Sequence, residues 1–184
     1  MGEGCQVQSA SLVSPLGQVH ILGCPKGVHR IEMHPESRDR SVLVSGCVRI
    51  DYNPSVKLNP ELQRGVEWLE AYFTNPHLAE TLPLPALHSP ILLGESFTAN
   101  VLRTLLHDVP VGQTVSYGRL AEMSGNLKAV RAVGGAMRRN PVPLIIPCHR
   151  VVLSSGQLGR YMNGRGDDLK QWLLNHEKNS TRSC

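Results

Sequence analysis

A cysteine, a histidine and an arginine follow one another in the segment IIPCHRVV, residues 145–152. An adjacent imidazole and guanidinium favour the thiolate form of a cysteine, which is the nucleophilic form. An apolar, β-branched run is also where proteins bury unreactive cysteines. From these eight residues alone, Cys148 is either a nucleophile or an inert core residue, and the core residue is the better interpretation.

The net charge of +4 is unevenly distributed, with −2 on residues 1–90 and +6 on residues 91–184. The stretch Leu127–Arg150 contains no acidic residue, and such a basic run is the electrostatic footprint expected for a phosphate backbone. A solvated helix face would explain five charges equally well. The basic residues of this stretch are Lys128, Arg131, Arg138, Arg139 and Arg150.

The composition is that of an ordinary globular protein, with 41% hydrophobic and 18% charged residues among 184. No segment approaches the roughly 20 apolar residues of a membrane span, and the N-terminus does not resemble a secretory signal. We therefore expect a soluble, intracellular protein without a membrane partner. The five cysteines lack framework spacing, which favours free thiols or metal ligands over disulfides.

Two patterns predict an α+β fold. In the first fifty residues, short apolar stretches are separated by the turns Pro15-Leu16-Gly17 and Pro25-Lys26-Gly27, which predicts a small antiparallel sheet. From Asn59 the apolar period becomes helical, with Pro60 at the first position and Asn75-Pro76 as the stop. The N-terminal part is therefore predicted to be a sheet with one helix.

The segment TLPLPALHSP, residues 81–90, contains three prolines and no periodicity, which is typical of an extended connection. We place a domain boundary there and expect domains at residues 1–85 and 86–184. The second domain is predicted to be mainly helical. Its helices are expected at Glu95–His107, at Tyr117–Met123 after a Ser116 cap, at Leu127–Arg139 after an Asn126 cap, and at about Asp168–Glu177.

The two helices at 117–123 and 127–139, joined at Gly125-Asn126, have the layout of a helix-turn-helix with a basic second helix. The second helix has few side chains that read base edges. Its small residues would let the backbone approach a sugar-phosphate groove, which favours binding without sequence reading. Compact helix packing is the competing explanation for the same residues, Ala129, Ala132, Gly134, Gly135 and Ala136.

Several segments carry a family resemblance that covers nearly the whole chain. The segment PCHRV, preceded by RAVGGAMRRNPVPLIIP, resembles the signature of the O6-alkylguanine-DNA alkyltransferases, the vertebrate members above all. The SPLG turn, the stretch ESFTANVLRTLLHDVPVGQTVSYGRLAEMSGN and the segment WLLNHE are similar to that family in order and spacing.

The resemblance implies direct-reversal DNA repair. Such a protein binds double-stranded DNA from the minor-groove side, largely independently of sequence, and turns the damaged nucleotide out of the stack. It moves an alkyl group from O6 of guanine, and more weakly from O4 of thymine, onto its own cysteine, once and irreversibly, without an organic cofactor. The chemistry agrees, because a thiolate suits displacement at carbon and O6 lies within the base stack. We expect a monomer, able to pack cooperatively along DNA, in the nucleus.

The resemblance assigns roles to five residues around the thiol. Cys148 becomes the alkyl acceptor, His149 takes the thiol proton through a water, and Glu177 orients that histidine. Asn140 braces the turn before the active-site strand, and the Tyr117 hydroxyl donates a proton to the purine N3. The alternatives are a surface helix end for Glu177 and a core aromatic for Tyr117.

Arg131 matches the arginine that enters the base stack in place of the flipped nucleotide, a role that suits a planar guanidinium. The predicted nucleobase pocket contains Pro143, Val151 and Tyr161, with the Met162 backbone N–H directed at guanine O6. The expected DNA-binding residues are Arg131, Lys128, Ala129, Arg138, Tyr117 and Arg150.

Four residues of the first domain, Cys5, Cys24, His29 and His88, coincide with the zinc ligands of the vertebrate members. Two thiolates and two imidazoles make a closed tetrahedral site, which implies structural zinc and no catalysis. Their spacing forms no local metal motif, so this expectation comes from the resemblance alone.

The chain departs from the family in YMNGRGDDLKQW, residues 161–172, which is about two residues longer, with Arg165, Asp167 and Asp168 replacing small or apolar residues. This difference concerns the range of alkyl groups rather than the reaction, and we expect bulky adducts to react more weakly.

Two other functions compete with alkyl transfer. A non-catalytic helix-turn-helix or lesion-recognition protein would lack the acceptor cysteine. A cysteine hydrolase is disfavoured, because neighbours on an extended strand such as Cys148 and His149 would point to opposite faces.

Overall fold

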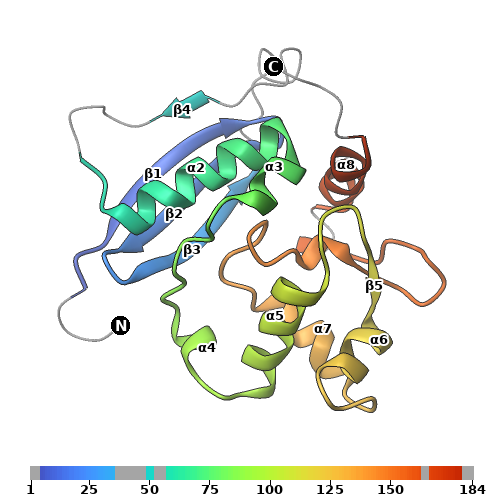
Figure 1. Cartoon of the computed structure of the whole chain (residues 1–184). Helices are drawn as coiled ribbons and strands as arrows, with labels where there is room; N and C mark the ends of the chain where they lie inside the picture. The colour runs from blue at the N-terminus through green and yellow to red at the C-terminus, as the bar shows by residue number, and fades with distance from the viewer. Residues whose placement is uncertain (1–4, 36–48, 52–56, 163–165, 180–184) are drawn as a thin grey trace. The chain divides into compact units, whose positions relative to one another are not determined.

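The protein is described by a computed structural model covering residues 5–35, 49–51, 57–162 and 166–179. Its contacts divide the chain after Pro90 into a first unit and a second unit, Ile91–Asn179. Within the ranges given above, no helix is long and apolar enough to cross a bilayer. The predicted α+β class is confirmed, because strands dominate the start of the chain and helices follow (Figure 1).

The first unit is built on an antiparallel sheet in the order β3-β2-β1-β4. Its strands are β1 Gln8–Ser14, β2 Gly17–Cys24, β3 Gly27–His34 and β4 Arg49–Asp51. Both predicted turns are confirmed as hairpin connections. Gly27 adopts a φ of +148°, and a Cβ there would lie 2.6 Å from the Ala86 carbonyl oxygen, so the second turn requires glycine.

Helix α2, Pro60–Thr74, runs along this sheet (Figure 1) and confirms the predicted helix. The Asn59 side chain accepts from the Leu62 N–H at 2.9 Å and caps the first turn. A Cβ at Gly65 would lie 2.6 Å from Ile21 Cδ1, which shows how closely the helix packs on the sheet. The predicted stop is confirmed, because α2 ends at Thr74, and Asn75 also caps a further helix, α3 Pro76–Thr81.

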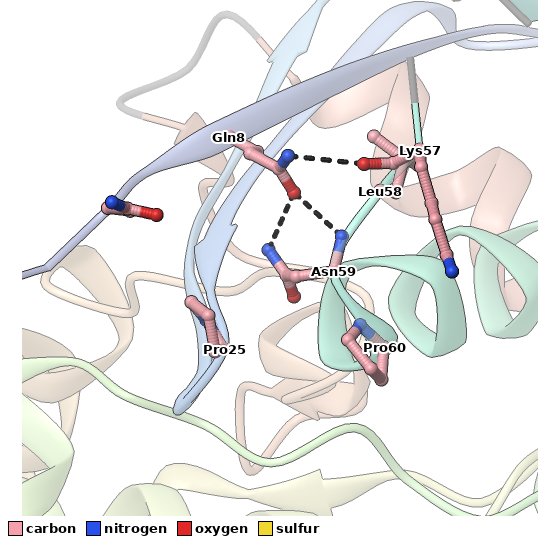
Figure 2. A pocket seen from close by; sticks show the side chains of 7 residues that line it. Gln8, Pro25, Lys57, Leu58, Asn59 and Pro60 are labelled. Atoms are coloured by element: carbon pink, nitrogen blue, oxygen red, sulfur yellow. Dashed lines mark hydrogen bonds between the residues drawn. The ribbon is translucent and has the colours of Figure 1, made fainter. Parts of the chain in front are cut away.

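Gln8 connects the start of β1 to the start of α2 (Figure 2). Its side-chain oxygen accepts from the Asn59 backbone N–H at 2.7 Å, and its amide donates to the Lys57 carbonyl at 3.2 Å. A shallow pocket of about 370 Å³ lies here. It is lined by Gln6, Gln8, Pro25, Lys57, Leu58, Asn59 and Pro60.

Residues 86–88 belong to the first unit, although we expected a boundary at 85/86. The Val28 N–H donates to the Ala86 carbonyl at 2.7 Å, and the His88 N–H donates to the Val28 carbonyl at 2.8 Å. This parallel bridge fixes the proline-rich segment against β3. Because it depends on a distant strand, the local sequence gave no sign of it, and the contact division falls after Pro90.

The second unit combines short helices with one pair of parallel two-residue strands, β5 Val115–Ser116 and β6 Val151–Val152. Its helices are α4 Pro90–Leu93, α5 Phe97–Asp108, α6 Tyr117–Met123, α7 Val130–Arg138 and α8 Asp167–Lys178. The predicted bounds of α6 and its Ser116 cap are confirmed.

The predicted starts of α5 and α7 were too early. Ser96 caps α5, because its hydroxyl accepts from the Ala99 N–H at 3.1 Å, so Glu95 stays outside the helix. Asn126 makes a turn instead of a helix cap, since its side chain accepts from the Lys128 N–H at 3.2 Å. As a result α7 begins at Val130, and residues 127–129 precede the helix.

Candidate active site

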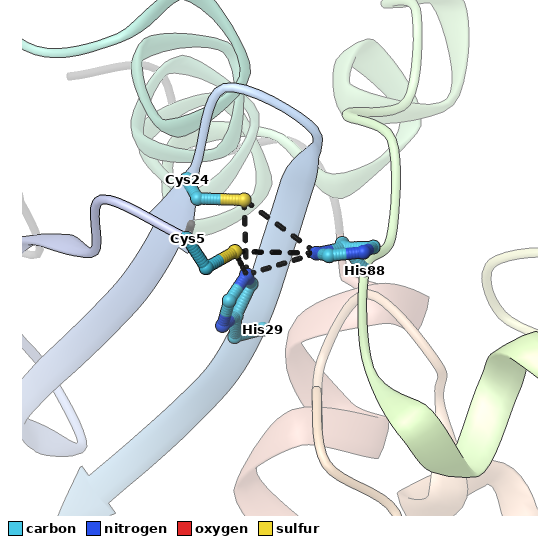
Figure 3. A group of neighbouring side chains, drawn as sticks. All are labelled: Cys5, Cys24, His29 and His88. Atoms are coloured by element: carbon cyan, nitrogen blue, oxygen red, sulfur yellow. Dashed lines mark hydrogen bonds between the residues drawn. The ribbon is translucent and has the colours of Figure 1, made fainter. Parts of the chain in front are cut away.

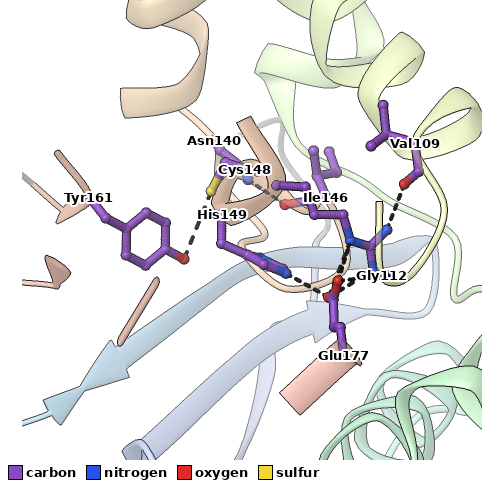
Figure 4. A network of polar contacts seen from close by, with 9 residues as sticks. Val109, Gly112, Asn140, Ile146, Cys148, His149, Tyr161 and Glu177 are labelled. Carbon is purple, nitrogen blue, oxygen red and sulfur yellow. Dashed lines mark hydrogen bonds and ion pairs between the residues drawn. The ribbon is translucent and has the colours of Figure 1, made fainter. Parts of the chain in front are cut away.

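Cys148 lies on a single 3₁₀ turn, Cys148–Arg150, that leads directly into β6 (Figure 4). The expectation of an extended strand at this point is wrong, because the Arg150 N–H donates back to the Pro147 carbonyl at 2.9 Å. The strict alternation of faces that we used against a cysteine hydrolase therefore does not apply to Cys148 and His149. Cys148 as a whole residue is 7% exposed.

Asn140 holds together the loop that precedes this turn. Its amide donates to the Ile146 carbonyl at 2.8 Å, and its carbonyl oxygen accepts from the Val142 N–H at 3.1 Å. The loop contains Leu144 in a left-handed conformation, with φ of 77°, although its side chain is fully buried. A side chain that bonds both ends of the loop offsets the cost of such a conformation.

Three neighbours act on the buried thiol. Burial raises the pKa of Cys148 above its ordinary value, and hydrogen bonds with Asn140 and Tyr161 together with the Lys170 charge offset only part of that rise. The Cys148 thiol and the Tyr161 hydroxyl oxygen are 3.9 Å apart. Because the resting thiol is held in its neutral form, attack requires a base that removes its proton.

His149 and Glu177 form a fully buried pair in which His149 Nε2 lies 2.7 Å from Glu177 Oε1 (Figure 4). The pKa of His149 is lowered, because burial together with the Arg150 and Lys170 charges outweighs the raising effect of the Glu177 carboxylate. The neutral imidazole then donates from Nε2 to the carboxylate, and Nδ1 is the basic nitrogen. The 3₁₀ turn therefore carries a thiol and a neutral imidazole, and α8 supplies the carboxylate that binds the imidazole.

Arg150 was expected to contact DNA, and the structure contradicts this, because its side chain is buried and bound. Its Nε and Nη2 donate to the two Glu177 oxygens, each at 3.0 Å, and its Nη1 donates to the Val109 carbonyl at 2.6 Å. The physical reason is that a buried carboxylate needs a counter-charge. Arg150 therefore does not contribute to the basic surface, and it supports the carboxylate instead.

The environment of Glu177 keeps it ionised. Burial alone would raise the pKa of this carboxyl, but hydrogen bonds from His149 and Arg150 and their charges hold it far below its usual range. The Gly112 N–H adds a further donor at 3.1 Å. The alternative of a solvated helix end for Glu177 is excluded by its burial.

Lys170 was missed by the sequence analysis. It is fully buried, and its ammonium group donates to the Val151 carbonyl at 2.6 Å. Burial lowers the pKa of Lys170, and the charges of Cys148 and Asp167 raise it. Helical spacing could have indicated it, because positions 170, 173 or 174, and 177 share one face of α8, and that face is buried.

The other residues predicted for the site are exposed to different extents. Tyr161 and Val151 are buried, Pro143 and Tyr117 are half-buried, and Met162 is exposed with a left-handed φ of 48°. Burial and the nearby Cys148 charge raise the pKa of the Tyr117 hydroxyl, while Arg138 lowers it. Tyr117 thus lies within electrostatic reach of both the thiol and a basic side chain of α7. Arg165 lies outside the described residues.

The surface of α7 favours an external partner over internal packing. Lys128, Arg131 and Arg138 are exposed, and Ala129 is half-buried. A Cβ at Gly134 would meet no atom within 4 Å, so internal packing does not require glycine there. Ala136 is fully buried, and compact packing explains that residue only.

A second cluster lies within the first unit, where Cys5, Cys24, His29 and His88 point toward one another (Figure 3). Their ligand atoms all lie within 4.8 Å of one another, with Cys24 Sγ to His29 Nε2 at 3.1 Å and His29 Nε2 to His88 Nδ1 at 3.2 Å. Bonds of about 2.0–2.3 Å to a tetrahedral metal give ligand separations of about 3.3–3.8 Å. The donor set therefore fits a metal ion. The bridge between residues 86–88 and β3 brings His88 there.

A family model described as 6-O-methylguanine DNA methyltransferase, DNA binding domain, matches residues 96–179. The methylated-DNA–protein-cysteine methyltransferase of Mus musculus is 46% identical over 188 residues, 96% of this chain and 84% of that protein. The Homo sapiens protein of the same name is 44% identical over 96% of this chain and 83% of its own length. The chain belongs to the methylated-DNA–protein-cysteine methyltransferase family.

Solved structures of this methyltransferase family have the same fold. The crystal structure of Mycobacterium tuberculosis O6-methylguanine methyltransferase has a TM-score of 0.70 and 30% identity, covering 97% of both chains. The Mycobacterium tuberculosis protein in complex with DNA has a TM-score of 0.69 and 29% identity, covering 94% of this chain and 93% of its own.

Replacing Glu177 by glutamine should lower the free energy of unfolding by about 3 kcal/mol at neutral pH, because buried Arg150 loses its counter-charge. The folded-state pKa of Glu177 is depressed, so its stabilising effect is present above the unfolded-state pKa of about 4.3 and is lost as the pH falls below it.

Urea unfolding of wild type and Glu177→Gln, from neutral pH to about pH 3, should show the difference shrinking with acid. Glu122→Gln is the matched control, because Glu122 pairs with Arg119 on the surface and should change stability by less than about 0.5 kcal/mol. A difference that stays constant with pH would contradict the assignment.

Proposed function

We propose that this protein repairs DNA by direct reversal, moving an alkyl group from O6 of guanine onto the sulfur of Cys148. The observation that carries the proposal is a buried thiol 3.9 Å from the Tyr161 hydroxyl and directly followed in the chain by a histidine bonded to buried Glu177, in a chain of this family. Repair of O4-alkylthymine would use the same pocket more weakly.

The reaction balances with groups of this chain. The sulfur attacks the alkyl carbon, a C–S bond forms, the C–O6 bond breaks, and its electron pair stays on the guanine. The thiol proton passes to Nδ1 of His149 through a bridging water, and the resulting imidazolium is stabilised by Glu177. The Tyr117 hydroxyl protonates N3, so that neutral guanine leaves. Since a thioether is a stable product, each molecule reacts once.

Helices α6 and α7 are proposed to act as a helix-turn-helix on double-stranded DNA. Gly134 of α7, where a Cβ would meet no atom within 4 Å, supports close approach to the minor groove, and Lys128 and Arg138 supply charge for phosphates. The exposed Arg131 side chain of α7 would fill the gap left by the flipped nucleotide. Such contacts carry little sequence information, and they suit a monomer able to bind side by side on DNA in the nucleus.

The Cys5–Cys24–His29–His88 cluster is proposed to hold a structural zinc ion. Four protein ligands close the coordination sphere, so the ion would cross-link β2, β3 and the segment around His88 without taking part in chemistry. Alkyl transfer itself would require no organic cofactor.

Mixing the protein with duplex DNA containing O6-methylguanine should add one methyl group to the protein, located on the peptide that contains Cys148. Cys148→Ser should gain none yet bind the same duplex with nearly unchanged affinity, because a serine hydroxyl is a far weaker nucleophile and α7 is intact. Intact-mass and peptide mass spectrometry measure this. Methyl transfer by Cys148→Ser would refute the assignment, and repeated consumption of substrate would indicate hydrolysis.

Arg131→Ala should slow the reaction with methylated duplex at least about tenfold while leaving the reaction with free O6-benzylguanine nearly unchanged, because the free base needs no flipping. Lys128→Ala is the comparison variant, since it removes one charge from the same segment without a group that stacks. Single-turnover rates on both substrates measure the effect. Equal losses on the two substrates would give Arg131 a different role.

His88→Ala should abolish stoichiometric zinc binding, lower the melting temperature by about 5 °C or more, and slow transfer without eliminating it. His77→Ala is the control, because His77 is an exposed histidine of the same unit. Elemental analysis, thermal melting and transfer rates check the three outcomes. A folded but inactive His88→Ala protein would contradict a purely structural site.

A further inference from the structure

The backbone of Tyr161 is held by the residues with which α8 begins. Its N–H donates to the Asp167 carboxylate at 2.9 Å, and its carbonyl accepts from the Gly166 N–H at 3.1 Å. A Cβ at position 166 would lie 2.9 Å from Tyr161 Cδ1, so Gly166 also packs against the ring. The backbone N–H and the backbone carbonyl of Tyr161 are thus both hydrogen-bonded, to the consecutive residues Asp167 and Gly166.

Tyr161 is a wall of the site that faces the acceptor cysteine. Its ring is buried, and its hydroxyl lies 3.9 Å from the Cys148 sulfur. It is followed by Met162 in a left-handed conformation. Residues other than glycine adopt this conformation rarely, and they keep it where neighbouring contacts hold it. The bonds to Gly166 and Asp167 are the described contacts that fix this end of the segment.

Asp167 and Asp168 differ in spite of being neighbours. Both are exposed and lie in the first turn of α8, where a carboxylate interacts favourably with the helix dipole. Only Asp167 reaches back to Tyr161, and its charge also favours the protonated form of Lys170. Among the described contacts, the Asp168 side chain makes no hydrogen bond. The two residues therefore share the helix effect and differ in the contact to the site.

We propose that Asp167 is a positioning residue for alkyl transfer, which fixes the Tyr161 backbone and thereby the wall of the nucleobase pocket opposite Cys148. This inference rests on the proposed function and extends it. It also bears on the longer loop, because one of the two carboxylates that replace small or apolar residues there has a partner within the protein.

The test compares wild type, Asp167→Ala, Asp167→Asn and Asp168→Ala in reaction with free O6-benzylguanine at increasing concentration. The free base is used because its reaction depends on the site around Cys148 and not on the charge of DNA. Asp167→Ala should raise the half-saturating concentration about fivefold, as expected for losing one hydrogen bond to a charged group, with a smaller change in the limiting rate. Asp167→Asn keeps an acceptor oxygen and should stay within about twofold of wild type.

Asp168→Ala is the matched control. It also removes one charge from the first turn of α8, so both alanine variants should lower the melting temperature by similar amounts. Only Asp167→Ala should raise the half-saturating concentration of free base. Equal losses in Asp167→Ala and Asp168→Ala would overturn the proposal, and so would an Asp167→Asn variant as weak as Asp167→Ala.

The outcomes separate this inference from the proposed function. If wild type transfers neither the benzyl group of the free base nor the methyl group of methylated duplex to Cys148, the proposed function fails. If wild type reacts and Asp167→Ala has the same half-saturating concentration, only the role of Asp167 fails. Should Asp167→Ala not fold, Asp167→Glu replaces it, because the longer side chain displaces the acceptor oxygen and should show the same weakening, while Asp167→Asn does not.

Discussion

The buried carboxylate of Glu177 is the constraint on which the rest of the second unit depends. An isolated buried charge is strongly unfavourable, so its position requires a full set of donors. Arg150 supplies three hydrogen bonds from its Nε and Nη2, and His149 and Gly112 supply one each. These donors come from the segment around Cys148 and from the loop that follows α5. The hydrogen bonds to one carboxylate therefore hold the turn Cys148–Arg150 against α8. The catalytic geometry is thus a consequence of charge compensation.

The same arrangement explains how a buried thiol can react. Burial raises the pKa of Cys148, which protects it from unspecific chemistry, and burial also keeps His149 neutral and therefore able to accept a proton. Burial is the main cause of the lowered His149 pKa and the Arg150 charge adds to it, so the carboxylate orients an imidazole that stays neutral. Lys170, the buried cation nearby, favours the thiolate once the proton has left. Reactivity is therefore conditional on proton transfer.

Local sequence predicted those parts of the fold whose cause is local. The two hairpin turns, α2 with its Asn59 cap and α6 with its Ser116 cap were correct because glycine conformation and capping act over a few residues. The 3₁₀ turn at Cys148 and the bridge of residues 86–88 to β3 depend on distant partners, and local patterns did not show them. Arg150 was misjudged for the same reason, since charge alone does not reveal that its partner lies 27 positions away. The residues of the site came from the family resemblance, whereas the burial of Lys170 required the structure.

Helix α8 carries the consequences of the longer loop. Lys170 and Glu177 are seven residues apart, about two helical turns, so their relative position on one face is independent of what precedes the helix. A change of loop length can therefore be absorbed between Tyr161 and the start of α8 without disturbing the buried charges. What the loop does affect is Tyr161, whose backbone is bonded to the first residues of the helix. Under the proposed function, variation at this point acts on the Tyr161 side of the site and leaves the buried groups of α8 in place.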